Sequence, residues 1–224
     1  MLFVVGGVLI LALVFGPRLW IRAVMARHAG PRPDFPGTGG ELARHLLDEA
    51  GLQSVPVEVG TSDHYDPVAK AVRLSDANFN GVSLTAVAVA AHEVGHALQD
   101  RDGYAPLSVR TRVVKVAARA DQITTAATMA LSILGSATIS PRLLLFGGIA
   151  VILSGLIRVG ADLITLPVEF DASFNRALPM LAGGYIPSQD QAAARSVLRA
   201  AAFTYVASAL VSMLNLMRFV RLFR

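Results

Sequence analysis

The sequence predicts a mainly α-helical integral membrane protein, with about four hydrophobic helices and a small α+β domain on the cytoplasmic side. Hydrophobic residues make up 54% of the 224 residues, charged residues only 16%, and the mean hydropathy is +0.54. A soluble domain does not need this much apolar sequence for its core. The excess lies in long apolar stretches of the length that a bilayer requires.

The first apolar stretch predicts a retained transmembrane anchor over residues 1–22. Leu2 to Phe15 carries no charge, and Arg18, Trp20 and Arg22 follow it. A cleaved signal peptide has its positive charges before the apolar run, which is the reverse of this order. The basic residues behind the anchor predict an outside N-terminus and a cytoplasmic continuation, with Trp20 at the interface.

Residues 23–122 are predicted to form the cytoplasmic domain. It begins with a proline-rich linker, Gly30 to Gly37, which cannot form regular structure because each proline lacks an amide donor. Thr38 and Glu41 then have the spacing of a capping box, and apolar residues follow at helical intervals up to Gly51. The domain therefore opens on a short amphipathic helix.

The motif His92-Glu93-Val94-Gly95-His96 lies within a helix predicted for residues 83–100. At 3.6 residues per turn, the two histidines fall about 40° apart around the axis and about 6 Å apart along it, so both imidazoles can reach one cation. Glu93 is turned about 100° from His92, beside a metal rather than on it, where it can act as the catalytic base. The pattern favours a zinc hydrolase over two histidines that meet by accident.

A catalytic zinc ion needs a third protein ligand, which must come from elsewhere in the chain. The chain has no cysteine, so the ligand is a histidine or a carboxylate. His28 lies in the basic flank of the anchor and His45 on the exposed side of the first soluble helix, and we expect neither to bind metal. Glu169, directly after a long apolar stretch, is the candidate, and the alternative is a solvated carboxylate at the membrane border.

Topology supports Glu169 independently. Residues 123–166 predict a transmembrane helical hairpin, divided into two apolar stretches by Ser140-Pro141-Arg142. Two crossings return the chain to the side that it left. Glu169 opens the predicted third-ligand segment, residues 167–199, and therefore emerges on the face that carries the histidine motif.

Residues 200–224 predict a last hydrophobic helix followed by a basic tail. If this helix crosses the bilayer, the basic tail lies outside, against the positive-inside bias, so a half-inserted or tilted helix is the alternative. Arg158 and Asp162 lie four residues apart within the preceding apolar stretch, which predicts an ion pair between them.

Six segments of the chain carry a family resemblance: Asp63-His64-Tyr65-Asp66-Pro67, Arg73-Leu74-Ser75, Ala90-Ala91-His92-Glu93-Val94-Gly95-His96-Ala97, Gly103-Tyr104-Ala105-Pro106-Leu107, Leu166-Pro167-Val168-Glu169-Phe170-Asp171-Ala172-Ser173 and Val197-Leu198-Arg199-Ala200-Ala201. Through them the sequence resembles the YugP-type neutral zinc metallopeptidases, membrane-bound bacterial proteins, over nearly its whole length. The resemblance implies a zincin-like domain of the gluzincin kind, similar in site design to the HtpX-like membrane proteases. It implies zinc as the cofactor, one ion per chain, with Glu169 as the third ligand.

The chain departs from one gluzincin feature. Many gluzincins place an aspartate four residues after the ligand glutamate, where it orients a metal-bound histidine, and Ser173 stands there in this chain. Asp171 lies only two residues from Glu169 and would face another way on a helix. The residue that orients the histidines is therefore not predicted by the motif.

Three further residues are weaker candidates. Alternating valines on both sides of Asp63 to Pro67 predict a small hairpin or sheet edge, and His64 and Tyr65 there could contact substrate. We favour the alternative that this segment forms a turn, because aspartate and proline are common turn residues. Arg176, seven residues beyond Glu169, could steady a tetrahedral intermediate or meet lipid phosphate.

These observations predict a multi-pass protein of the inner (plasma) membrane that hydrolyses peptide bonds at the cytoplasmic surface, with peptides or membrane proteins as substrates and the lipid bilayer as its surroundings. A zinc-binding scaffold or pseudoprotease without turnover is the alternative, although a scaffold has no need of Glu93. A transporter would place more ionisable groups at mid-membrane. The net charge of +4 is scattered among apolar stretches, so no nucleic-acid partner is expected.

Overall fold

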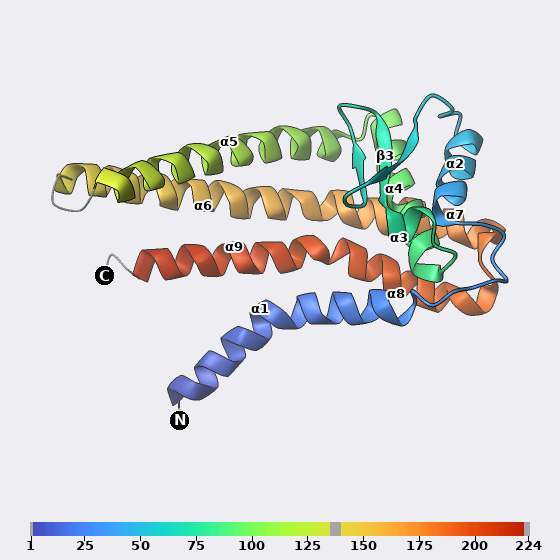
Figure 1. Ribbon diagram of the computed structural model, residues 1–224, viewed down its shortest axis with the longest axis horizontal. Coiled ribbons are helices and arrows are strands. Elements are labelled where there is room, and N and C mark those ends of the chain that lie inside the picture. The colour runs from blue at the N-terminus through green and yellow to red at the C-terminus, as the bar shows by residue number, and fades with distance from the viewer. Residues whose placement is uncertain (1, 135–139, 222–224) are drawn as a thin grey trace.

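The computed structural model describes residues 2–134 and 140–221. Four long helices in this part of the chain extend from a cluster of shorter elements, here called the head (Figure 1). The long helices are α1 (Leu2–Arg27), α5 (Ala105–Leu134), α6 (Pro141–Phe170) and α9 (Thr204–Arg221). The head comprises α2 (Gly39–Glu49), β1 (Val57–Gly60), β2 (His64–Asp66), β3 (Ala71–Ser75), α3 (Asp76–Phe79), α4 (Leu84–Arg101), η2 (Asp171–Ala177), α7 (Leu178–Met180), η3 (Leu181–Tyr185), η4 (Ser188–Asp190) and α8 (Gln191–Ala202).

Two stretches of the described chain are long and apolar enough to cross a membrane. They are Leu145–Tyr185, which contains most of α6, and Ser188–Met217, which contains most of α9. Helix α6 packs between α5 and α9, and α1 packs on α8 and α9 (Figure 1). Large apolar side chains on α5 and α6 remain exposed, namely Ile123, Met129, Ile133, Leu145, Phe146, Leu153 and Leu156. This apolar outer surface indicates association with a membrane.

The predicted count of about four hydrophobic helices stays a prediction. Residues 135–139, which end the first stretch of the predicted hairpin, lie outside the described residues, as do 222–224 of the basic tail. Ser140 caps the N-terminus of α6, where its hydroxyl accepts a hydrogen bond from the amide of Leu143. Pro141 follows as the first helical residue, a position that suits proline because the amide there has no helical partner.

Helix α4 is the centre of the head, and all but three of its residues are buried. The hydroxyl of Ser83 accepts a hydrogen bond from the amide of Ala86 and so starts the helix, and Gly103, with φ of +64°, follows its end. These bounds agree with the predicted helix over residues 83–100. Helix α2, η2, α8 and the sheet pack around α4, so the predicted motif helix is enclosed on several sides.

The short helix α2 has the predicted capping box. The Thr38 hydroxyl accepts a hydrogen bond from the Glu41 amide, and the Glu41 carboxylate accepts one from the Thr38 amide. Past its end, Gly51 has φ of +72°, a left-handed conformation that glycine adopts without strain. Local sequence was therefore enough to predict where this helix begins and ends.

The sheet has three strands in the order β1-β3-β2. The valine-rich segments on either side of Asp63 to Pro67 form β1 and β3, which pair in parallel, so they do not make a hairpin with each other. The antiparallel pair is β2 and β3, and β2 lies at the edge of the sheet, as the alternative prediction of a sheet edge has it. The favoured assignment of Asp63 to Pro67 as a turn was wrong in its position, because His64–Asp66 is strand β2. The turn follows it: the Asp66 carboxylate accepts hydrogen bonds from the amides of Val68 and Ala69, so Asp66 begins the turn.

Candidate metal centre

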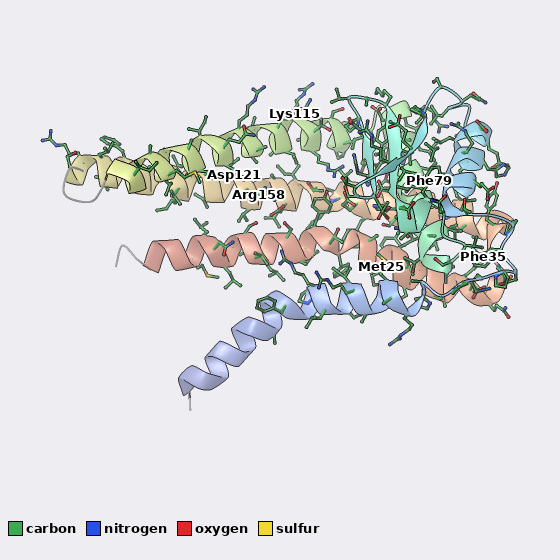
Figure 2. All side chains as sticks on the ribbon, in the orientation of Figure 1. Met25, Phe35, Phe79, Lys115, Asp121 and Arg158 are labelled. Carbon is green, nitrogen blue, oxygen red and sulfur yellow. The ribbon has the colours of Figure 1, made fainter. Side chains whose placement is uncertain are left out.

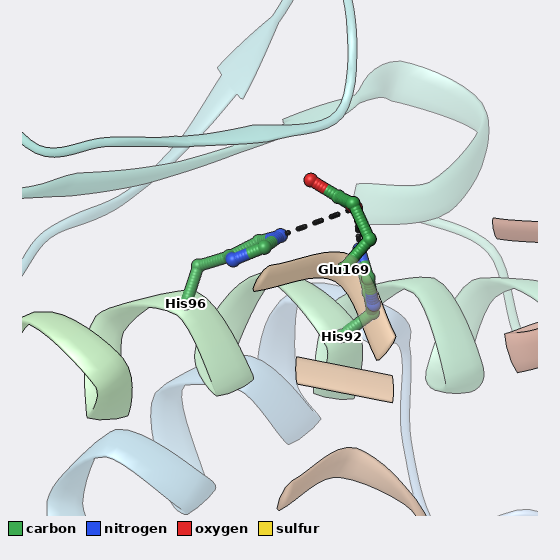
Figure 3. A group of neighbouring side chains, drawn as sticks. All are labelled: His92, His96 and Glu169. Carbon is green, nitrogen blue, oxygen red and sulfur yellow. Dashed lines mark hydrogen bonds and ion pairs between the residues drawn. The ribbon is translucent and has the colours of Figure 1, made fainter. Parts of the chain in front are cut away.

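Three side chains predicted from the sequence meet in the structure. His92 and His96 project from one face of α4, and Glu169 reaches them from the last turn of α6 (Figure 3). Glu169 Oε2 lies 3.1 Å from His92 Nε2 and 3.6 Å from His96 Nε2. All three side chains are buried, and one donor atom from each lies within 4.8 Å of the other two. The group is therefore close enough to share one ion.

The hydrogen bonds of His92 determine which of its two ring nitrogens carries the hydrogen and which has a free lone pair. His92 Nδ1 lies 3.0 Å from the Ser173 hydroxyl oxygen, and that hydroxyl donates its one hydrogen to the Leu198 carbonyl at 3.2 Å. His92 Nδ1 must then donate to Ser173. The neutral ring consequently presents a lone pair on Nε2 toward Glu169. Ser173 thus takes the orienting role that the sequence left unassigned.

His96 is oriented in the same way by Gln99, a residue that the sequence analysis missed. His96 Nδ1 lies 2.9 Å from Gln99 Oε1. Gln99 is fully buried, and its amide nitrogen donates to the Val168 carbonyl and to Asp171, so its oxygen is the acceptor for His96 Nδ1. The Nε2 lone pair of His96 therefore also faces Glu169. The signal in the sequence was the position of Gln99, three residues after His96 and therefore on the same helical face.

This arrangement fits a divalent cation. Two imidazole lone pairs and a carboxylate oxygen converge, and none of the three atoms carries a hydrogen when the rings are neutral. Without a cation they would repel, whereas two protonated rings would place two extra charges in a buried site, which costs several kcal/mol. Imidazole and carboxylate ligands with oriented outer nitrogens are characteristic of zinc sites. His92, His96 and Glu169 can therefore hold a zinc ion.

Gly95, inside the motif, allows Glu169 to come close to α4. A Cβ atom at position 95 would lie 2.8 Å from the carbonyl oxygen of Ala172 in η2. Backbone cannot yield at that distance as a flexible side chain can, so only glycine permits this packing. The same contact brings Ser173 to His92 and Asp171 to Gln99. Gly95 thus couples the helix that carries the histidines to the segment that supports them.

Glu93 lies in the same pocket as the three donor side chains, and this pocket has a volume of about 250 Å³. Residues from the helices and from the sheet line it: Met25, Asp63, His64, Tyr65, Val89, His92, Glu93, His96, Arg110, Glu169, Ala201, Thr204 and Tyr205. Its carboxyl group is buried, and burial raises its pKa to about 7, although the neighbouring His92 acts in the opposite direction. A carboxylate with a pKa near the working pH is well suited to accept and return a proton. The pocket therefore contains, beside the three donor atoms, a buried carboxyl group with the proton affinity that a general base requires.

Two further residues of the pocket, Arg110 and Tyr205, were not identified from the sequence. Arg110 Nη2 donates to the Tyr205 hydroxyl oxygen at 2.8 Å and lies 3.4 Å from Glu169 Oε1. Glu169 Oε1 is buried and has no hydrogen-bond partner among the described residues, so the Arg110 charge is what faces it. These residues come from α5 and α9, far from the motif in sequence, and no local pattern marks them.

The remaining candidates lie at different places. His64 and Tyr65 line the pocket, but the Tyr65 hydroxyl donates to Asp100 at 2.6 Å and His64 Nδ1 lies 3.0 Å from the Ser62 carbonyl. Arg176 does not line the pocket. Its guanidinium group donates to Asp102 at 2.6 Å and to Asp171 at 2.8 Å, which places Arg176 in a structural ion-pair network instead of at the reaction centre.

Comparison with known proteins agrees with this geometry. The family described as "Putative neutral zinc metallopeptidase" matches residues 2–224. The "Putative membrane protease YugP" of Bacillus subtilis (strain 168) is 38% identical over 226 residues, which cover 100% of this chain and 97% of the relative. No solved structure matches the chain. The match along the full length shows that this protein belongs to the YugP-type family of neutral zinc metallopeptidases.

Proposed function

We propose that this protein is a zinc-dependent endopeptidase that cleaves protein or peptide substrates at the cytoplasmic surface of the inner membrane. His92, His96 and Glu169 hold one zinc ion, and Glu93 is the catalytic base. The observation that carries the proposal is the convergence of three metal-donor atoms beside a buried carboxyl group in one pocket. A scaffold would need the donors but not Glu93.

Zinc bound at this site would supply Lewis-acid chemistry, polarising the scissile carbonyl and acidifying water. Glu93 accepts a proton from the attacking water as the new C–O bond forms. It then delivers that proton to the amine nitrogen as the C–N bond breaks, so the base is regenerated. Ser173 and Gln99 hold the two imidazoles through their Nδ1 atoms during this cycle.

Strand β2 offers a place for the substrate backbone. Among the described residues it pairs with β3 alone, so it is an edge strand. Its residues His64 and Tyr65, and Asp63 just before them, line the pocket. An extended peptide can pair with a free strand edge through main-chain hydrogen bonds. The contacts of Tyr65 with Asp100 and of His64 with Ser62 fix the side chains of this edge, and substrate would pair with its backbone.

Arg110 provides the positive charge that the reaction needs beside the carbonyl oxygen. Replacing Arg110 by methionine should lower kcat by about 100-fold, the scale of losing one donor that stabilises a developing oxyanion. Turnover of zinc-saturated protein is the measurement, and Arg112→Met, an exposed arginine on the same helix, is the matched control. Parent-level turnover in Arg110→Met would show that this charge plays no part.

Experiments with sealed membrane vesicles test the peptidase activity and also the side of the membrane on which it occurs. Inside-out vesicles that carry the protein should cleave an added unfolded soluble protein, a zinc chelator should stop cleavage, and added zinc should restore it. Right-side-out vesicles should be inactive if the head lies in the cytoplasm, the orientation that the basic residues after the anchor favour. Cleavage only by right-side-out vesicles would refute the orientation, and cleavage by neither would refute the peptidase.

A further inference from the structure

A second group of polar side chains lies outside the metal centre, between the long helices. An open groove of about 560 Å³ has a lining that includes the polar residues Arg18, Asp121, Ser154, Arg158, Ser212 and Asn215. Figure 2 shows two of them, Asp121 on α5 and Arg158 on α6, close to one another along the paired helices. Nothing in the proposed reaction uses these groups.

The groove is related to the metal centre through shared lining residues. A smaller cavity of about 300 Å³ lies between them, lined by Arg18, Ile21, Arg22, Thr204, Ala207 and Ser208. It shares Thr204 with the pocket of the metal centre, and it shares Arg18 and Ser208 with the groove. The three hollows therefore adjoin one another along α9, and together they are here called the furrow.

The furrow extends to the depth of the apolar stretches. Arg158 precedes Glu169 by eleven residues on α6, which corresponds to about 16 Å along the helix, and Asn215 follows Tyr205 by ten residues on α9, about 15 Å. Both residues lie within the two stretches that are apolar and long enough to span a bilayer. Polar groups at this depth are costly, and they are found where they serve a function.

Outside the metal centre, the furrow is lined by three arginines, Arg18, Arg22 and Arg158, and by one aspartate, Asp121. Asp121 accepts a hydrogen bond from Ser154 at 2.8 Å and pairs with Arg158 at 3.4 Å. Asp162, beside the furrow, accepts from Ser208 and Ser212 and lies 3.8 Å from Arg158, which confirms the predicted pair between these two residues. The described part of the chain gives no partner to the side chains of Thr124, Thr125 and Asn215. The furrow therefore offers mainly neutral hydroxyl and amide groups.

We propose that the furrow binds an unwound part of a substrate's transmembrane segment, next to the bond that is cleaved. This inference rests on the proposed function and names its substrate class as membrane proteins. A peptidase acts on extended backbone, whereas a transmembrane segment arrives as a helix with all its backbone groups paired. Unwinding exposes N–H and C=O groups that lipid cannot satisfy, and hydroxyl and amide side chains can pair with them. Asp121 and Asp162 offset the charge of Arg158. A lipid phosphate would instead bind at Arg18 and Arg22, which have no ion pair among the described residues, and the cross-linking experiment below distinguishes this occupant.

Photo-cross-linking in the full chain tests the occupant directly. A benzophenone amino acid is placed at Asn215, and at Met213 as the control, in the Glu93→Gln background. Met213 is exposed on α9 and does not line the furrow. The protein is reconstituted in phosphatidylcholine and phosphatidylglycerol vesicles with a single-span membrane protein. We expect adducts with that protein from position 215 and not from 213. Equal adducts from both positions, or adducts with lipid alone, would overturn the proposal.

Kinetics provide a second, separate readout. Asn215→Phe narrows the furrow, and it should lower the rate for the single-span protein relative to that for a soluble unfolded protein by about tenfold, equivalent to about 1.4 kcal/mol. Met213→Phe should leave this ratio unchanged. An unchanged ratio in Asn215→Phe would contradict the furrow while the peptidase stands. A parent protein that cleaves neither substrate would refute the proposed function, and the cross-linking result does not depend on cleavage.

Discussion

Replacing Glu93 by glutamine is expected to abolish peptide hydrolysis while zinc stays bound. Glutamine has nearly the same shape, and Glu93 is not one of the three converging donors, so the site should keep its metal. The substitution removes the carboxylate that accepts a proton from water and returns it to the leaving amine. Removing a general base lowers rates by about 10²- to 10⁴-fold, and here the same group serves both proton transfers.

The measurement is turnover per zinc ion with an unfolded protein substrate, with bound zinc determined on the same sample. Glu58→Gln provides a matched control, because it makes the same chemical change at a partly exposed carboxylate in strand β1. We expect the control to retain parental turnover. Undiminished cleavage by Glu93→Gln would show that another group is the base.

Replacing Glu169 by alanine is expected to weaken zinc binding by more than about 100-fold. Outer residues that merely orient a ligand already contribute about 10- to 100-fold, and Glu169 is placed as a ligand itself. The change also leaves the partly buried positive charge of Arg110 without the carboxylate that it faces, since Glu169 Oε1 lies 3.4 Å from it. Both effects disturb the same site, so cleavage should fall with zinc occupancy.

Competition with a chelator of known zinc affinity measures the loss. Glu169→Gln distinguishes charge from shape, because it keeps an oxygen near the histidines and still offers Arg110 a polar neighbour. Circular dichroism should show that both variants stay folded. If Glu169→Ala binds zinc as tightly as the parent, the third ligand lies elsewhere.

Parts of this site were predictable because they depend on local geometry. The separation of His92 and His96 follows from helix periodicity alone, and the capping residues around α2 and α4 bound those helices as expected. Glu169 followed from counting membrane crossings, a constraint that requires no knowledge of packing. These inferences needed only the order of residues along the chain.

Other parts depend on how separate segments pack. Arg110 and Tyr205 come together from α5 and α9, and Arg110 reaches Glu169 on α6, so this group forms only when the three helices pack together. Asp171 was expected to face away from the site on a regular helix. The chain instead continues from α6 as the π-helical segment η2. Asp171 there accepts a hydrogen bond from Gln99, and Gln99 in turn contacts His96. Arg176 likewise forms ion pairs with Asp102 and Asp171, which the packing of η2 on α4 brings near it.

X-ray absorption at the zinc edge of the purified protein tests the proposed coordination most directly. It should show zinc bound by two imidazole nitrogens at about 2.0–2.1 Å and by carboxylate oxygen at about 2.0–2.2 Å. The oxygen contribution should change in Glu169→Ala while the imidazoles remain. A spectrum with fewer than two imidazoles, or one that is unaltered when Glu169 is replaced, would contradict the assignment of His92, His96 and Glu169 as the zinc ligands.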